Sequence, residues 1–183
     1  MIDVFQRIEE APLRETEGGL VPEGDGWYVV NVAEGRGMWS DRFGAACVFE
    51  GTERFPEFGI NVHVLQPGQP SSMYHREDAQ EAFLVLSGQA LAIVEDEERP
   101  LHTGDFLYAP PGAAHVLVGA GDGPCAILMV GTRKDPETLL YPVSAVAARY
   151  GASVEEETSD EGAAYAGTPA PAAGPVGMPW SPA

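Results

Sequence analysis

Six short apolar segments follow one another between residues 59 and 131, and each is bounded by turn residues. They occupy positions 60–65, 81–88, 90–95, 105–110, 115–119 and 125–131. Pairs such as Pro67-Gly68 and Pro111-Gly112 separate them, and such pairs are typical of tight turns. Short strands at this spacing indicate an all-β fold, either a β-sandwich or a β-barrel. Closure into a barrel would remove the exposed edges of the sheet.

The rest of the chain divides by composition. Residues 1–54 are polar and glycine-rich, and we expect an arm with one or two strands that wraps the strand-rich domain of residues 55–131. Residues 132–166 predict a short helical extension. Alanine, proline and glycine dominate residues 167–183, and such a tail cannot form a packed core by itself. We expect this tail to be mobile and to add little to stability, unless an aromatic residue such as Trp180 docks.

The spacing of four residues in this segment predicts the helical extension. Four residues recur with the helical period, namely Val143, Val146, Ala147 and Tyr150. Gly151 follows them as a natural C-cap. Ser153 with Glu156 three residues later indicates a capping box for another short helix.

The charge balance is strongly acidic. The chain has ten Lys and Arg residues and 28 Asp and Glu residues, which gives a net charge of −18. Such a chain repels phosphate backbones and anionic membrane surfaces, so we expect no nucleic-acid or membrane partner. The first ten residues lack the pattern of a secretion signal, and Cys47 and Cys125 form no CxxC pair. We therefore expect two buried free thiols and a cytoplasmic protein.

Four titratable residues stand at or near the ends of the expected strands. His75 and Glu77 alternate along one segment and so share a face, and Glu81 can join them across the turn into the next strand. His115 follows a Pro-Pro-Gly turn at the start of another strand. Two imidazoles and two carboxylates that converge inside a small barrel suit a divalent cation.

The same stretch resembles the paired motifs of the cupin superfamily. The second motif is matched by Gly104, Pro110, Gly112 and His115, with Gly119 at a position where Asn is frequent. In the first motif, Glu81 and Gly88 keep the family spacing, and His75 and Glu77 take the two histidine positions. Six residues rather than five separate Gly68 from His75, which is a small departure.

The resemblance implies a single cupin-type β-barrel, or jelly roll, that pairs into a homodimer through its strands and its N-terminal arm. It also implies one divalent metal ion per chain, held here by His75, Glu77, Glu81 and His115. Glu77 replaces the usual second histidine, and two carboxylates favour Mn or Fe, although Ni and Zn stay open. The alternative is a cupin that has lost its metal, with Glu77 paired to Arg76 or to another nearby arginine.

Other side chains are candidates for the wall of the barrel cavity. We expect His63, Met73, Phe83, Phe106 and Leu117 in this role, whereas His102 is expected at the surface. The glycine-rich run 119–124 joins two strands and opens no helix, so it indicates a hairpin turn and not a phosphate loop.

Two classes of function follow. The first is a metal-dependent enzyme of the oxygenase or isomerase type that acts on a small molecule, with Glu81 or Glu77 as the catalytic base. The second is a non-catalytic cupin that binds or senses a small ligand. The sequence contains no GxSxG, HExxH or P-loop motif, which removes the commoner hydrolase and NTPase hypotheses.

Overall fold

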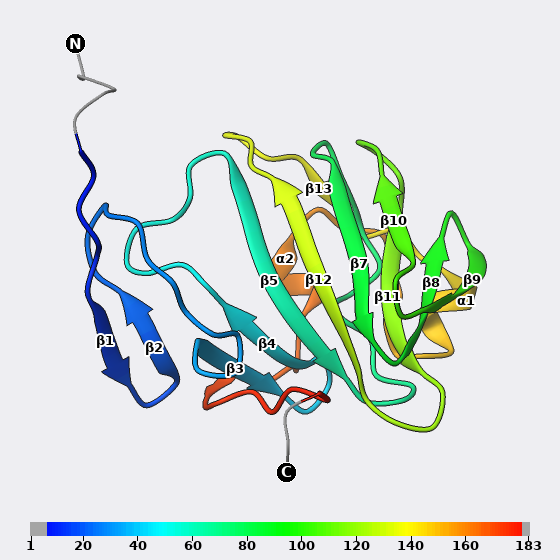
Figure 1. Ribbon diagram of the computed structural model, residues 1–183. Helices are drawn as coiled ribbons and strands as arrows, with labels where there is room; N and C mark the ends of the chain where they lie inside the picture. Colours follow the sequence, from blue (N-terminus) through cyan, green and yellow to red (C-terminus); the bar gives the residue numbers. More distant parts are fainter. Residues whose placement is uncertain (1–6, 181–183) are drawn as a thin grey trace.

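The structure, a computed structural model, describes residues 7–180. Most of its regular structure is β-strand, with two short helices (Figure 1), so the prediction of an all-β fold is confirmed. Residues 1–6 of the expected arm and residues 181–183 of the expected tail lie outside the described residues.

Two antiparallel sheets make up most of the molecule. The larger has seven strands in the order β10 (Phe106–Ala109), β7 (Glu81–Ser87), β12 (Cys125–Thr132), β5 (Phe58–Leu65), β4 (Gly44–Val48), β3 (Arg36–Ser40) and β14 (Ala172–Ala173). The smaller has three, in the order β11 (His115–Ala120), β8 (Gln89–Val94) and β9 (Glu97–His102). Two further pairs are β1 (Leu13–Thr16) with β2 (Gly19–Pro22), and β6 (Arg76–Glu77) with β13 (Leu139–Leu140).

The expectation of a closed barrel is wrong, because no ladder within residues 7–180 joins the larger sheet to the smaller one. The free edge of β11 meets the segment 70–75 only through isolated bridges, at Val118 with Pro70 and at His115 with His75. This segment crosses the edge as an irregular loop, so the ladder of backbone hydrogen bonds is interrupted there. The two sheets instead face each other as a sandwich.

The main core lies between the sheets. Phe83, Val85 and Ile127 of the larger sheet pack with Ala90 and Leu117 of the smaller one, and all five are buried. On β11 the side chains alternate. Leu117 belongs to this inner core, whereas Val116 and Val118 pack outward in a second cluster with Ala147 of α1 (Ala145–Ala148).

The tail packs on the molecule, which corrects the expectation that it is mobile. β14 pairs with β3 at the edge of the larger sheet (Figure 1). Val176 and Met178 are buried with residues of β4 and β5, such as Cys47 and Val62. Isolated apolar residues in a stretch of alanine, proline and glycine therefore cover the outer face of this sheet.

Local elements differ from the expectations in three further places. The described part of the arm holds four strands, and two of them, β3 and β4, join the larger sheet. β9 follows a hairpin turn at Glu95 and Asp96, whose φ angles are 50° and 62°. No helix begins at Ser153, and α2 (Glu161–Ala164) starts instead after the N-cap Asp160.

Two local predictions are confirmed. α1 lies within the expected helical segment, where the N-cap Ser144 accepts a hydrogen bond from the Ala147 N–H and Gly151 adopts a φ of 69° just after the helix. Cys47 and Cys125 are free and buried.

Candidate metal centre

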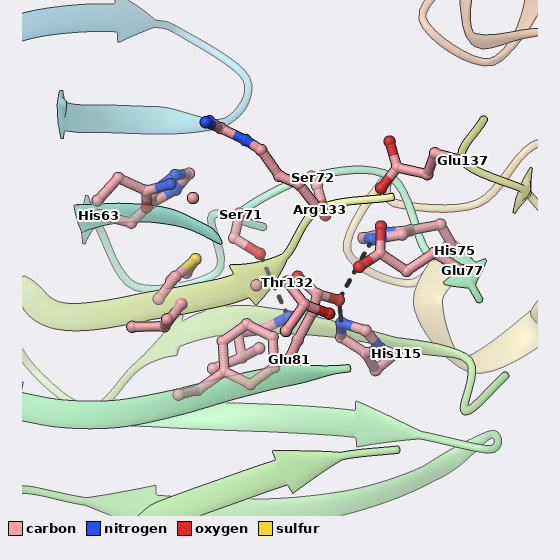
Figure 2. Close-up of a pocket in the computed structure, with 17 residues that line it drawn as sticks. His63, Ser71, Ser72, His75, Glu77, Glu81, His115, Thr132, Arg133 and Glu137 are labelled. Carbon is pink, nitrogen blue, oxygen red and sulfur yellow. Dashed lines mark hydrogen bonds and ion pairs between the residues drawn. The ribbon is translucent and has the colours of Figure 1, made fainter. Parts of the chain in front are cut away.

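Three side chains from separate segments, two of them strands, meet at one end of the space between the sheets. Glu81 opens β7, His115 opens β11, and His75 lies in the loop just before β6. Their ligand atoms all lie within 4.8 Å of one another (Figure 2). Two of the motif glycines explain why the sequence folds in this way. Gly88 turns the chain after β7 with a φ of 80°, and a Cβ at Gly119 would lie 2.2 Å from the Gln66 carbonyl oxygen.

The Glu81 carboxylate lies between the two imidazoles. Its Oε2 atom is 2.7 Å from Nε2 of His115 and 3.9 Å from Nε2 of His75. Glu81 Oε2 and His115 Nε2 are both buried, yet neither has a hydrogen-bond partner among the described residues. Their contact therefore lacks the angles of a hydrogen bond. Buried polar atoms without partners are rare, and a cation bound between these two atoms would satisfy both.

The backbone fixes which ring nitrogen faces this point. The Nδ1 atom of His75 lies 2.8 Å from the Met73 carbonyl oxygen, and that of His115 lies 3.0 Å from the Ala113 carbonyl oxygen. A carbonyl only accepts, so in each neutral ring Nδ1 carries the proton and Nε2 carries the lone pair. Two nitrogen lone pairs and a carboxylate then converge with no proton between them. This donor set fits a divalent cation, and it is the arrangement in which outer carbonyl groups orient histidine ligands.

The electrostatics favour a neutral ring at His75 and a carboxylate at Glu81. Burial lowers the pKa of His75, and the charge of His115 lowers it further. Burial alone would lower the pKa of His115 and raise that of Glu81. The close contact between these two groups outweighs burial, so the pKa of His115 is raised and that of Glu81 is lowered. Glu81 is thus a carboxylate at neutral pH.

Glu77 lines the same cavity but is not one of the three clustered ligands. Its carboxyl group interacts with those of Glu81 and Glu137 (Figure 2). Burial, the charge of Glu81 and the contact with Glu137 together raise the pKa of Glu77 to about 8. Arg76 pairs with Glu95 instead, at 4.0 Å, so it does not form the ion pair with Glu77 that the metal-free alternative expects.

The three clustered residues line a cavity of about 300 Å³, which we call the site cavity. Of the expected wall residues, His63, Phe83 and Leu117 line it. Phe106 points away and is exposed on β10, and Met73 is buried in a separate cluster with Tyr141. His102 is exposed, as expected.

Several wall residues have no counterpart in the sequence predictions. They are Asn61, Ser71, Ser72, Thr132, Arg133 and Glu137. Asn61 shares the inner face of β5 with His63, so strand alternation is a signal that can find it. Arg133 and Glu137 belong to the loop after β12, where no local pattern marks a site.

Arg133 is the one cationic side chain among the residues that line the site cavity, and it is already paired. Its guanidinium donates to both carboxylate oxygens of Glu50, at 2.6 and 2.9 Å. It also donates to the Phe55 carbonyl oxygen. Burial would raise the pKa of Glu50, but the hydrogen bonds and charge of Arg133 outweigh burial and lower it. This pair joins the loop after β12 to the segment after β4.

Comparison with known proteins finds a cupin domain in this chain. Residues 61–131 match the cupin domain family model. A putative sugar phosphate isomerase from Acidithiobacillus ferrooxidans is 33% identical over 47% of this chain and 56% of its own, with a TM-score of 0.45. A cupin-superfamily sugar phosphate isomerase from Silicibacter pomeroyi is 30% identical over 52% of this chain and 62% of its own, with a TM-score of 0.47. The similarity thus spans less than two thirds of either relative.

A third similar structure shows only a shared fold. The polyketide cyclase RemF from Streptomyces resistomycificus is 16% identical over 58% of this chain and 79% of its own, with a TM-score of 0.50. No curated protein sequence matches the chain.

The family match covers the strands that carry Glu81 and His115 and the segment that carries His75. Residues 61–131 are the cupin domain of the chain. Within residues 7–180, no helix is long and apolar enough to cross a membrane.

Proposed function

We propose that this cupin is a metal-dependent enzyme of the oxygenase or isomerase type that acts on a small organic molecule. The observation that carries the proposal is the group of His75, Glu81 and His115 at the wall of an open cavity. Two histidines and one carboxylate bind a divalent ion and leave coordination positions for other ligands. The bound ion would supply a Lewis acid that polarises a substrate oxygen.

Glu77 is proposed as the acid–base residue beside the metal and as a fourth ligand when its proton leaves. Its raised pKa, about 8, suits a group that takes up and returns a proton near neutral pH. Glu81, whose pKa is lowered, is better suited to hold the cation. The neighbouring carboxyl group of Glu137 helps to raise the pKa of Glu77, and so favours a proton on Glu77 near neutral pH.

The charges of the site cavity favour a neutral or weakly charged substrate. Glu77, Glu81 and Glu137 line the cavity, and Arg133 is held by Glu50. A phosphorylated substrate would meet carboxyl groups and no free cation among the lining residues. This argues against a substrate like those named for the two isomerases above.

We also propose a cytoplasmic homodimer. Two buried free thiols fit a reducing compartment. In the arm, Trp27 and Val29 are 51% and 77% exposed, and apolar side chains of this size suit a contact with a second copy. Light scattering at micromolar concentration should give twice the monomer mass, and a monomer would contradict the dimer.

The test of the metal proposal starts from protein purified without a nickel column. We expect about one divalent ion per chain by elemental analysis, and none in the His115→Ala variant. The exposed His102→Ala variant is the control and should keep the ion. Protein loaded with Mn(II) should accelerate the relaxation of water protons, because open coordination positions exchange with water. Metal binding without this acceleration would favour a closed, non-catalytic site, and absence of metal from the wild-type protein would reject the proposal.

A further inference from the structure

A second cavity, of about 420 Å³, lies next to the site cavity along the inner face of the larger sheet. His63 and Ser71 line both cavities, so the two spaces meet at these side chains. We call the second space the tail cavity, because residues 168–171 of the tail form part of its wall. Nothing in the chemistry of the metal centre accounts for it.

Apolar side chains dominate the wall of the tail cavity. Phe43 and Tyr165 pack edge to face, with ring centroids 5.3 Å apart. Met38 and Trp39 of β3 line the cavity and are 38% and 44% exposed. Exposed apolar surface of this kind inside a concave wall is typical of a ligand site.

Hydrogen bonds hold two of the aromatic residues, Tyr165 and Trp39, in place. The Tyr165 hydroxyl accepts a hydrogen bond from the Met73 N–H at 3.2 Å. The Trp39 indole N–H donates to the Pro175 carbonyl oxygen at 2.9 Å. β14 also pairs with β3 at Trp39. The wall is therefore built by the packed fold and does not depend on ligand to form.

The boundary between the two cavities is polar and uncharged. Asn61 Oδ1 and His63 Nδ1 are buried without a hydrogen-bond partner among residues 7–180. Burial lowers the pKa of His63 to about 4, so its ring is neutral at physiological pH. The two side chains that line both cavities, His63 and Ser71, are thus neutral at physiological pH, which suits the uncharged part of a ligand.

We propose that the substrate has two parts, a polar end that binds the metal at His75, Glu81 and His115, and an apolar part, aromatic or hydrocarbon, that occupies the tail cavity. This inference rests on the proposed function, because it takes the metal centre as the site of the polar end. The tail cavity then sets which substrates fit, while the metal centre sets the chemistry.

The test uses hydroxamates, which share one metal-binding group and differ in their apolar part. Zn(II)-loaded protein is titrated with acetohydroxamate, benzohydroxamate, 3-phenylpropanohydroxamate and 5-phenylpentanohydroxamate. We expect at least one phenyl compound to bind about tenfold or more tightly than acetohydroxamate, since burial of a ring removes apolar surface from water. Equal affinities for all four would overturn the inference and leave the metal proposal intact.

Two variants test whether the tighter binding of the phenyl compounds comes from the tail cavity. Ala46→Phe fills the tail cavity from β4, and Met38→Trp narrows it from a partly exposed position that tolerates a larger side chain. Both should remove the advantage of the phenyl compounds and leave the affinity for acetohydroxamate unchanged, which also shows that they fold. Ala148→Phe, on the exposed side of α1, is the control and should bind as the wild type does. If both cavity variants kept the full advantage, the apolar part would lie elsewhere and the inference would be wrong.

A probe without a metal-binding group separates the two proposals. If the protein binds no Zn(II), the proposed function fails. The tail cavity is then tested with 3-phenylpropanamide by saturation-transfer NMR. Transfer that disappears in Ala46→Phe would support the apolar site, and no transfer to the wild-type protein would overturn it.

Discussion

His75 and His115 are direct partners in an antiparallel bridge. The His115 N–H donates to the His75 carbonyl oxygen at 2.8 Å, and the His75 N–H donates to the His115 carbonyl oxygen at 3.2 Å. Their imidazole centroids lie 5.0 Å apart on one side of this bridge. Two candidate ligands that are 40 residues apart in sequence are thus positioned by a single backbone bridge. Side chains of a bridged pair point the same way, so the bridge itself brings the rings together.

Glu77 should affect metal binding less than the three clustered ligands do. Glu77→Gln keeps the shape but removes the carboxyl group that can ionise and bind the cation, and we expect the affinity for Mn(II) to fall by about 10- to 100-fold. Glu77→His should keep one ion per chain and change which metal is preferred, because it restores a third imidazole. Isothermal titration with Mn(II), Ni(II) and Zn(II) measures both effects. Complete loss of metal in Glu77→Gln would place Glu77 among the essential ligands.

Metal affinity should rise with pH. The pKa of Glu77 is raised to about 8, so its carboxyl group holds a proton at neutral pH in the metal-free protein, and the pKa of His115 is raised from 6.5 by the contact with Glu81. A cation that binds these groups competes with protons, and each displaced proton changes the affinity by about tenfold per pH unit below the pKa of its group. Calorimetry between pH 6 and pH 8.5 in two buffers gives the number of protons released. The slope should be shallower in Glu77→Gln, and an equal slope would show that Glu77 stays protonated when the ion binds.

His63 should weaken the fold at acidic pH. Its pKa is lowered from 6.5 to about 4, so the unfolded chain takes up a proton below pH 6.5 while the folded chain does not. The stability is therefore complete above pH 6.5 and is lost as pH falls toward 4, by at most about 3 kcal/mol. Urea unfolding of wild type and His63→Gln at pH 7 and at pH 4.5 measures the difference. A pH dependence that is the same in both proteins would contradict this account.

The ion pair of Arg133 and Glu50 should stabilise the loop that lines the site cavity. Arg133→Ala leaves Glu50, which is 6% exposed, without its two strong hydrogen bonds. We expect the free energy of unfolding to fall by about 2 kcal/mol. Repulsion between Glu50 and other carboxylates adds little to this loss, because solvent screens it. Arg99→Ala removes a cation whose ion pair with Glu97 is exposed to solvent, and it serves as the control. Equal stability of the two variants would show that the pair contributes nothing.

The packed tail should matter for stability. Replacing Val176 and Met178 together by Ala removes two buried apolar side chains, and we expect a loss of about 3 kcal/mol or more. Differential scanning fluorimetry gives the shift in Tm, and Ala166→Ser at an exposed position is the control. A shift no larger than that of the control would mean that the tail is as mobile as its composition predicts.

The sequence predicts most of the strands and the clustering of three of the four candidate ligands, because those signals are local. Alternating apolar residues between turns mark each strand, and motif spacing relates Glu81 to His75 and to His115. Glu137 and Arg133 cannot be found in this way, since a loop after the last long strand brings them to the cavity. The docking of Val176 depends on a groove made by β4 and β5, far away in sequence. Barrel closure depends on the hydrogen bonding of one loop, which no residue pattern specifies.

The hydrogen bonds from Nδ1 of His75 and His115 to the carbonyl groups two residues earlier have a kinetic consequence. Both rings are oriented by the folded backbone, so the loss of side-chain entropy accompanies folding and not ion capture. An arriving cation then meets nitrogen atoms already facing it and waits for no rearrangement of the rings. The rate of association should follow how fast each metal exchanges its own hydration water, with Mn(II) entering much faster than Ni(II).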